Sequence, residues 1–73
     1  MIKTYTLPNC PMCEELKSYM KNSHIMFEEA NVETDPNALA KMTFEGIEHY
    51  PAVEINGMIY SGDVSDLKNI VSR

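Results

Sequence analysis

The feature that most constrains this chain is the segment NCPMC at residues 9–13, which contains its only two cysteines, Cys10 and Cys13. Proline is favoured at the first turn of a helix, where its missing N–H would have no partner, so Pro11 marks a helix start and Cys10 its cap position. The preceding segment IKTYT, residues 2–6, is rich in β-branched and aromatic residues and ends at a Leu-Pro-Asn turn signal. The two thiols are therefore predicted at a turn that leads from a strand into a helix.

An amphipathic helix is predicted to follow and to end near Asn22 and Ser23. Apolar residues recur at helical spacing along it, and charged residues fall between them. The apolar positions are Met12, Cys13, Leu16, Tyr19 and Met20. Cys13 then lies one turn inside the helix on its apolar face, so we expect its thiol to be buried.

A strand and a short helix are predicted in the middle of the chain. Residues 25–32 (IMFEEANV) have the length and composition of a strand. Asp35 and Pro36 supply a helix cap followed by proline at the first helical position. Leu39 and Met42 then form an i, i+3 apolar pair before a glycine ends the run. A second helix is expected here.

A hairpin and a third helix are predicted at the end of the chain. Segments 51–55 (PAVEI) and 58–60 (MIY) flank Asn56-Gly57, a dipeptide that tolerates positive φ at both positions of a type I′ turn. The final helix places four apolar residues on one stripe: Val64, Leu67, Ile70 and Val71. The order β-α-β-α-β-β-α predicts an α/β fold, in which a parallel pair and an antiparallel hairpin form a mixed four-stranded sheet flanked by helices.

The length and charge of the chain narrow its function further. A chain of 73 residues is long enough for one domain, residues 1–73, with a thin core in which Tyr5, Met26, Phe27 and Tyr60 are expected to pack on the sheet. The formal net charge of −5 argues against a nucleic-acid partner, which needs clustered Lys and Arg. Neither a signal peptide nor a membrane-spanning apolar run is recognisable, so we expect a cytoplasmic monomer without membrane contact.

Two cysteines this close in a reducing cytoplasm are more often catalytic or metal-binding than structural. The helix macrodipole and the backbone N–H groups of Met12 and Cys13 favour a thiolate at Cys10, and such settings lower a cysteine pKa from about 8.5 to roughly 3.5–7.5. Cys10 is therefore predicted to be the nucleophile of thiol–disulfide exchange, and Cys13 the resolving thiol. This cycle needs no metal.

Three other roles stay open for the cysteines at this point. A closed zinc site needs four ligands, yet the only histidines, His24 and His49, lie far apart and neither belongs to a second ligand pair. Two chains could share an iron–sulfur cluster through Cys10 and an external thiol. The chain could also be a binding module in which the CxxC motif has no chemical role.

Three longer segments of the sequence are similar to those of a known protein family: YTLPNCPMCEELKSYM, GIEHYPAVEING and YSGDVSDLKNIV. In order and spacing, over nearly the whole chain, they resemble the glutaredoxins and the similar NrdH-type redoxins of the thioredoxin superfamily. The resemblance implies a thioredoxin-like fold and a thiol–disulfide oxidoreductase that reduces protein or mixed disulfides through the dithiol of residues 10–13. The alternative within the family is an NrdH-type redoxin, which donates electrons to ribonucleotide reductase and is recharged by thioredoxin reductase.

The resemblance also implies binding residues. In the family a cis proline faces the CxxC motif, and the residue before it offers backbone hydrogen bonds to substrate, as an added strand would. The matching residues here are Tyr50 and Pro51. The Gly and Asp that hold the γ-glutamyl end of glutathione at the start of the last helix match Gly62 and Asp66, with Ser65 beside them.

Departures from the family pattern affect the choice of electron donor. Leu7 stands where many glutaredoxins carry a basic residue that meets a glutathione carboxylate, and Met12 stands where tyrosine is common. Pro11 and Met12 are expected to contact substrate. The pair His49-Tyr50 is bulkier than usual, and we expect His49 to face water. We expect no bound cofactor, a disulfide-containing protein as substrate, and either glutathione as cosubstrate or a flavoprotein reductase as donor.

Overall fold

The computed structural model of residues 1–73 has the predicted order of elements. The elements are β1 (Ile2–Thr6), α1 (Pro11–Asn22), β2 (Phe27–Asn31), α2 (Pro36–Phe44), β3 (Ala52–Ile55), β4 (Met58–Ser61) and α3 (Val64–Val71). None of the three helices combines the length and the apolar character that a membrane crossing requires.

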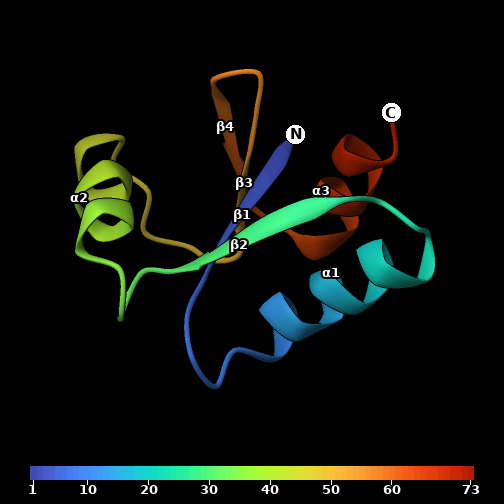
Figure 1. Ribbon diagram of the computed structural model, residues 1–73, viewed down its shortest axis with the longest axis horizontal. Helices are drawn as coiled ribbons and strands as arrows, with labels where there is room; N and C mark the ends of the chain where they lie inside the picture. Colours follow the sequence, from blue (N-terminus) through green and yellow to red (C-terminus); the bar gives the residue numbers. More distant parts are fainter.

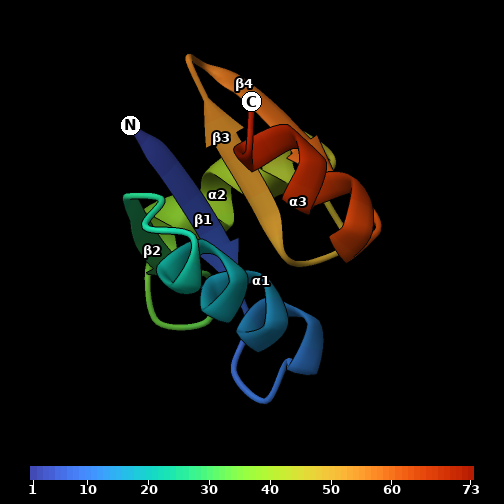
Figure 2. The ribbon, with the colours of Figure 1, turned by 90° about the vertical axis from the view of Figure 1, so that its right-hand side faces the viewer.

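The four strands form one mixed sheet in the order β2-β1-β3-β4. Strand β1 is parallel to β2 and antiparallel to β3, and β3 is antiparallel to β4, as the sequence predicts. Figure 1 shows α2 on one face of the sheet and both α1 and α3 on the other. In Figure 2, α1 and α3 lie next to each other across that face. The chain leaves the end of β1, an interior strand, and enters α1 on the face of the sheet that α1 and α3 cover.

The core consists of two apolar clusters, one on each face of the sheet. The cluster on the α2 face contains Tyr5, Ala30, Val32, Ala38, Met42 and Ala52. The cluster under α1 and α3 contains Leu16, Met20, Val53, Val64, Leu67 and Val71. Full burial of a large apolar side chain stabilises a fold by about 1.5–3 kcal/mol. The second cluster thus attaches α1, which carries the cysteines, to the sheet and to α3.

Strand β2 is shorter than the strand predicted over residues 25–32, because it starts at Phe27 and ends at Asn31. Its pairing with β1 begins at Ile2 and Phe27, so Met26 precedes the ladder at the edge of the sheet. The Met26 side chain is 78% exposed, and the prediction that it packs on the sheet is wrong. The other three residues expected there are buried or half-buried: Tyr5, Phe27 and Tyr60.

Helix α2 buries a different pair from the predicted Leu39 and Met42. Leu39 is 48% exposed, whereas Ala38 and Met42 face the core. Both i, i+3 and i, i+4 pairs fit a helical period, so the pattern alone did not decide the rotation of the helix. The helix start is as predicted: Asp35 accepts hydrogen bonds from the backbone N–H groups of Asn37 and Ala38 at 3.1 and 3.2 Å.

The turn between β3 and β4 has the predicted conformation. Asn56 and Gly57 have φ values of 52° and 82°, and Ile55 pairs with Met58 on either side of them. Positive φ at both central residues is the signature of a type I′ turn, whose twist matches that of the strands. The local chemistry of two residues therefore sets the register of the hairpin.

Candidate active site

Cys10 lies at the N-cap of α1, with extended backbone angles (φ −114°, ψ 101°), and Pro11 occupies the first helical position. The backbone N–H of Cys13 donates to Cys10 Sγ across 3.1 Å, and the N–H of Glu14 donates to the Cys10 carbonyl. The positive end of the helix macrodipole thus points at the sulfur of Cys10. Cys10 thus holds the predicted cap position, but of the two N–H groups expected at its sulfur, those of Met12 and Cys13, only that of Cys13 donates to it.

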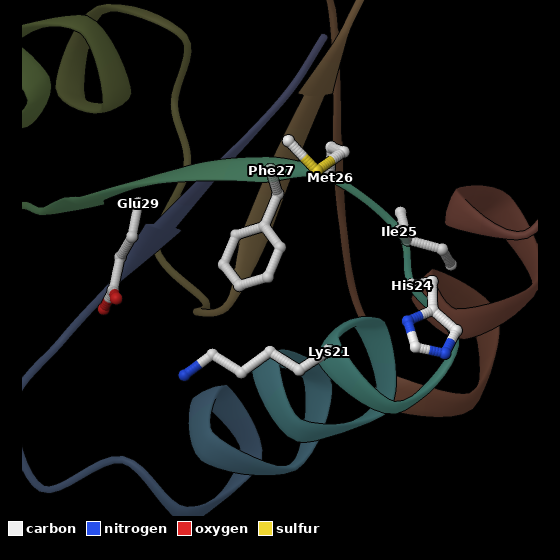
Figure 3. A pocket seen from close by; sticks show the side chains of 6 residues that line it. All are labelled: Lys21, His24, Ile25, Met26, Phe27 and Glu29. Atoms are coloured by element: carbon white, nitrogen blue, oxygen red, sulfur yellow. The ribbon is translucent and has the colours of Figure 1, made fainter.

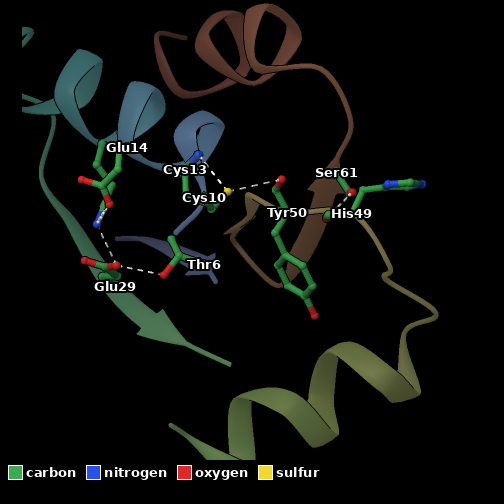
Figure 4. The surroundings of a disulfide bond; sticks show 9 residues. Thr6, Cys10, Cys13, Glu14, Glu29, His49, Tyr50 and Ser61 are labelled. Carbon is green, nitrogen blue, oxygen red and sulfur yellow. Dashed lines mark hydrogen bonds and ion pairs between the residues drawn. A yellow bond between two sulfur atoms is a disulfide. The ribbon is translucent and has the colours of Figure 1, made fainter. Parts of the chain in front are cut away.

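Cys10 and Cys13 form a disulfide, with their Cα atoms 5.2 Å apart. Cys13 is fully buried beneath the first turn of α1, while Cys10 is only partly covered. Figure 4 shows the Cys10 sulfur at the end of the helix, on the side that faces the loop before β3. Of the two sulfurs, that of Cys10 is therefore the one reachable from outside.

The loop before β3 brings Tyr50 and Pro51 to the disulfide. Their peptide bond is cis, as the resemblance implies, and Pro51 is buried. The carbonyl oxygen of Tyr50 lies 4.0 Å from Cys10 Sγ (Figure 4), although the two residues are forty positions apart. The hydroxyl of Ser61 donates to the His49 carbonyl at 3.0 Å and so attaches this loop to the end of β4. The backbone next to Cys10 is thereby held in place.

A groove of about 250 Å³ lies beside the disulfide. Its lining residues come from α1, from the loop before β3 and from the segment before α3: Met12, His49, Tyr50, Gly62 and Asp63. Three of the expected binding residues thus meet in one place. Pro11, Ser65 and Asp66 are exposed and do not line the groove, although Ser65 and Asp66 belong to the first turn of α3. His49 is exposed, as predicted.

A larger hollow of about 550 Å³ lies away from the cysteines, at the other end of α1 (Figure 3). It is lined by Lys21, His24, Ile25, Met26, Phe27 and Glu29. The Phe27 ring points from β2 toward α1, above the Lys21 side chain. At 1.5 Å per residue, Lys21 is roughly 16 Å along the helix from Cys10, so this hollow is separate from the redox site.

No group of three or more His, Cys, Asp or Glu side chains is gathered in an arrangement that could hold a metal ion. A dithiol at a helix start, opposite a cis proline and beside a groove, is instead suited to exchange with another disulfide.

Comparison with known proteins agrees with this geometry. The glutaredoxin family model matches residues 2–59. The chain belongs to the glutaredoxin family. A glutaredoxin-like 8.6 kDa protein of the rubredoxin operon of Clostridium pasteurianum is 35% identical over 63 residues, which cover 85% of this chain and 84% of that protein. The glutaredoxin-like protein NrdH of Lactococcus lactis is 26% identical over 62 residues, covering 85% and 86% of the two chains.

The fold agrees as well. The NrdH-redoxin of Escherichia coli, a glutaredoxin-like protein, superposes with a TM-score of 0.83 at 30% identity over 94% of this chain and 91% of that one. The chain therefore has the thioredoxin-like fold, and its CxxC motif is that of a thiol–disulfide oxidoreductase. The reading of the CxxC motif as lacking a chemical role is not supported.

Two features of this glutaredoxin concern charged side chains near the CxxC motif. The sequence suggests that the acidic residues Glu14, Glu15, Asp63 and Asp66 lie around the groove, and of these Asp63 lines it. Its side chain makes no capping hydrogen bond, although it stands at the N-cap of α3. The signal available in the sequence was an acidic residue directly after Gly62, where the chain takes φ +140° and turns into the helix. A charged side chain at that turn is well placed to face a neighbouring loop.

The second feature is a chain of charges beside the CxxC helix, drawn in Figure 4. Lys17 Nζ lies 2.7 Å from Glu14 and 3.0 Å from Glu29, and the Thr6 hydroxyl donates to Glu29 at 2.8 Å. Partial burial pushes the pKa of Glu29 upward, but hydrogen bonds from Lys17 and Thr6 outweigh it and hold the pKa below its usual value. The hydrogen bond to Glu14 raises the pKa of Lys17. These contacts link α1 to β1 and β2.

Proposed function

We propose that this glutaredoxin reduces disulfides of protein substrates by a dithiol cycle in which Cys10 is the nucleophile and Cys13 the resolving thiol. The observation that carries the assignment is the position of Cys10 at the N-cap of α1, where the N–H of Cys13 points at its sulfur. That N–H and the helix dipole stabilise negative charge on Cys10. Cys13 is fully buried and has no route to a bulky substrate.

The cycle has two exchange steps. The Cys10 thiolate attacks one sulfur of the substrate disulfide, which forms a mixed disulfide and releases the other sulfur as a thiolate that takes up a proton. Cys13 then loses its proton and attacks Cys10 Sγ, which forms the intramolecular disulfide and releases the second substrate thiol. Two electrons pass from the dithiol to the substrate, and an external donor must reduce the Cys10–Cys13 bond to start the next cycle.

The groove supports the proposal that substrate binds across the cis-proline loop. A substrate chain in the groove meets the backbone of Tyr50 above Pro51, and it meets Met12 on the other side. Met12 is 52% exposed, and its flexible side chain suits varied docking partners. Gly62 also lines the groove, whereas Pro11 is exposed next to Met12 at the start of α1, and Ser65 and Asp66 lie in the first turn of α3.

A flavoprotein reductase of the thioredoxin reductase type is the electron donor that the groove favours. Glutathione carries two carboxylates, and the groove offers it the acidic side chain of Asp63 without a Lys or Arg. The E. coli NrdH-redoxin, with which this chain superposes, is described as having a thioredoxin-like activity profile. Glutathione is the second candidate, because the first turn of α3 has no side-chain cap and could meet a carboxylate through its free N–H groups.

The roles of the cysteines are tested by trapping. Cys13→Ser should accumulate a mixed disulfide with a protein substrate, seen as a reducible band of added mass, because no thiol remains to resolve it. Cys10→Ser, the matched control, should form none, since its remaining thiol is buried. Equal trapping by the two variants would show that the roles are wrongly assigned.

The electron donor is tested by turnover of an oxidised protein disulfide with NADPH. One reaction contains thioredoxin reductase, and the other contains glutathione with glutathione reductase. We expect the first to sustain turnover and the second to run at least about tenfold slower. Faster turnover with glutathione would assign the uncapped start of α3 to glutathione and reject the reductase proposal.

A further inference from the structure

The charge of the active-site groove is one-sided. Of its five lining residues, Asp63 is acidic and none is Lys or Arg. The side chain of an N-cap Asp ordinarily accepts a hydrogen bond from a backbone N–H one turn into the helix, which spreads its charge. Asp63 makes no such bond. Its carboxylate therefore stays available to a molecule in the groove.

The cationic side chains of the chain lie elsewhere. Three lysines form ion pairs. Lys17 pairs with Glu14 and Glu29, Lys41 pairs with Glu54, and Lys68 pairs with Glu15. Lys3 lies over the ring of Tyr5, 5.6 Å from its centroid. Lys21 lines the hollow at the far end of α1, and Arg73 lines another with the first strand residues. None of the six lines the groove beside Cys10, and Asp63 takes part in none of the ion pairs of the structure.

A second carboxylate, that of Asp66, lies near Asp63 in α3. Asp66 lies in the first turn of α3, three residues after Asp63, so the two side chains emerge about one helical turn apart. Asp66 is exposed and takes part in none of the ion pairs of the structure. Glu48 precedes His49 in the loop before β3 and is also exposed. Asp63 is thus the acidic side chain that lines the groove, and Asp66 and Glu48 are exposed carboxylates close in the chain to its lining residues.

We propose that Asp63, supported by Asp66, determines substrate specificity by charge, so that this glutaredoxin reduces fastest those disulfides that are flanked by Lys or Arg. The inference rests on the dithiol function proposed above and names its substrate class: cationic peptide segments around a disulfide. A substrate sulfur must reach Cys10, which is 4.0 Å from the Tyr50 carbonyl, and the residues beside that sulfur must then occupy the groove that Asp63 lines.

Coulomb's law gives the size of the effect. At a separation of roughly 7 Å in a water-like dielectric, one carboxylate accelerates the approach of a single cation by about threefold and slows an anion by about the same factor. Asp63 alone should therefore give a Lys-to-Glu rate ratio of about ten at low ionic strength. The Debye length falls from about 30 Å at 0.01 M salt to about 3 Å at 1 M, so the ratio should approach one in high salt.

The test is a single-turnover measurement with the fully reduced chain, which needs no electron donor. Three peptides contain the same disulfide and differ only in one flanking residue, which is Lys, Ala or Glu. The release of peptide thiol gives a second-order rate constant for each peptide at 0.01 M and at 1 M salt. We expect the order Lys, Ala, Glu at low salt, with a Lys-to-Glu ratio of about ten that falls below about two in high salt.

Variants locate the effect. Asp63→Asn should lower the low-salt ratio by at least about threefold, Asp63→Lys should invert the preference, and Asp66→Asn should lower the ratio by less. The matched control is Glu28→Gln, which removes the same charge from an exposed site on β2, the strand at the opposite edge of the sheet from β4. This control should keep the wild-type ratio, and circular dichroism should show that all variants are folded.

The outcomes separate the two proposals. If the Ala peptide is not reduced at all, the dithiol function itself fails. If it is reduced but the Lys and Glu peptides react within twofold of each other at low salt, only the charge specificity fails. The specificity is also overturned if Glu28→Gln lowers the ratio as much as Asp63→Asn, because the effect would then follow the net charge of the chain rather than the groove.

Discussion

The two thiols of the reduced chain should differ greatly in their rate of alkylation, and the difference should come from burial more than from acidity. The helix dipole and the N–H of Cys13 favour the thiolate of Cys10 and so increase its reactive fraction. This gain is partly cancelled, because the intrinsic reactivity of a thiolate falls as its pKa falls, with a Brønsted slope of about 0.4–0.5. Acidity alone therefore makes only a small difference between the two thiols.

Burial has the larger effect. Cys13 is fully buried under the first turn of α1, so a reagent reaches its sulfur only when the turn opens. If local opening of a packed helix end costs about 3 kcal/mol of free energy, only about one molecule in 100 has an accessible Cys13 thiol at any time, since each 1.4 kcal/mol is a factor of ten. Burial therefore predicts alkylation of Cys10 about 100-fold faster than that of Cys13.

The assay uses reduced wild-type chain and a small excess of iodoacetamide at pH 7.5. Samples are quenched over time and digested, and mass spectrometry measures the label on each cysteine. The matched comparison is the same reaction in denaturant, where both thiols should react at similar rates. Comparable labelling of the two cysteines in the native chain, or faster labelling of Cys13, would refute the argument from burial and the assignment of Cys10 as nucleophile.

Three predictions concern stability, measured by circular dichroism on the oxidised chain. Leu16→Ala should lower the free energy of unfolding by about 3 kcal/mol and Tm by at least about 12 °C, because Leu16 is fully buried. Leu39→Ala, on the half-exposed face of α2, should lower the free energy of unfolding by less than about 1 kcal/mol. Similar losses for the two variants would contradict the observed burial. Hydrogen bonds from Lys41 and Tyr5 lower the pKa of Glu54, so Glu54→Gln should lower the free energy of unfolding by about 1 kcal/mol at pH 7. This difference should vanish as the pH falls through the lowered folded pKa and the wild-type carboxylate is protonated; a constant difference would refute the linkage. Gly57→Ala should cost about 1 kcal/mol because φ is +82° there, and no loss would mean that the turn relaxes.

The sign of the Glu54 prediction follows from the direction of its pKa shift. A carboxyl whose folded pKa is lowered below its unfolded value contributes stability at all pH values above the unfolded pKa. That contribution is lost as the pH falls through the folded pKa, when the proton displaces the hydrogen bonds from Lys41 and Tyr5. Glu54→Gln carries no titrating group, so its stability should depend less on pH in this window.

The parts of this protein that sequence alone determined are those whose physical cause spans only a few residues. Pro11 fixed the start of α1 because its ring fits the first helical position, and this placed Cys10 at the cap. Asn56-Gly57 set the hairpin through its tolerance of positive φ. Steric and hydrogen-bonding rules within one turn of the chain sufficed for the element order and for the position of the dithiol.

The parts that only the tertiary structure decided depend on contacts between distant segments. The inward rotation of α2, which buries Ala38 rather than Leu39, was set by packing on the sheet, because both residues satisfy the helical period. The cis bond before Pro51 was expected from the family resemblance alone. The approach of the Tyr50 carbonyl to Cys10, forty residues away in the chain, depends on the fold. Asp63 lines the active-site groove because the sheet brings the start of α3 beside the start of α1, an arrangement that no local rule contains.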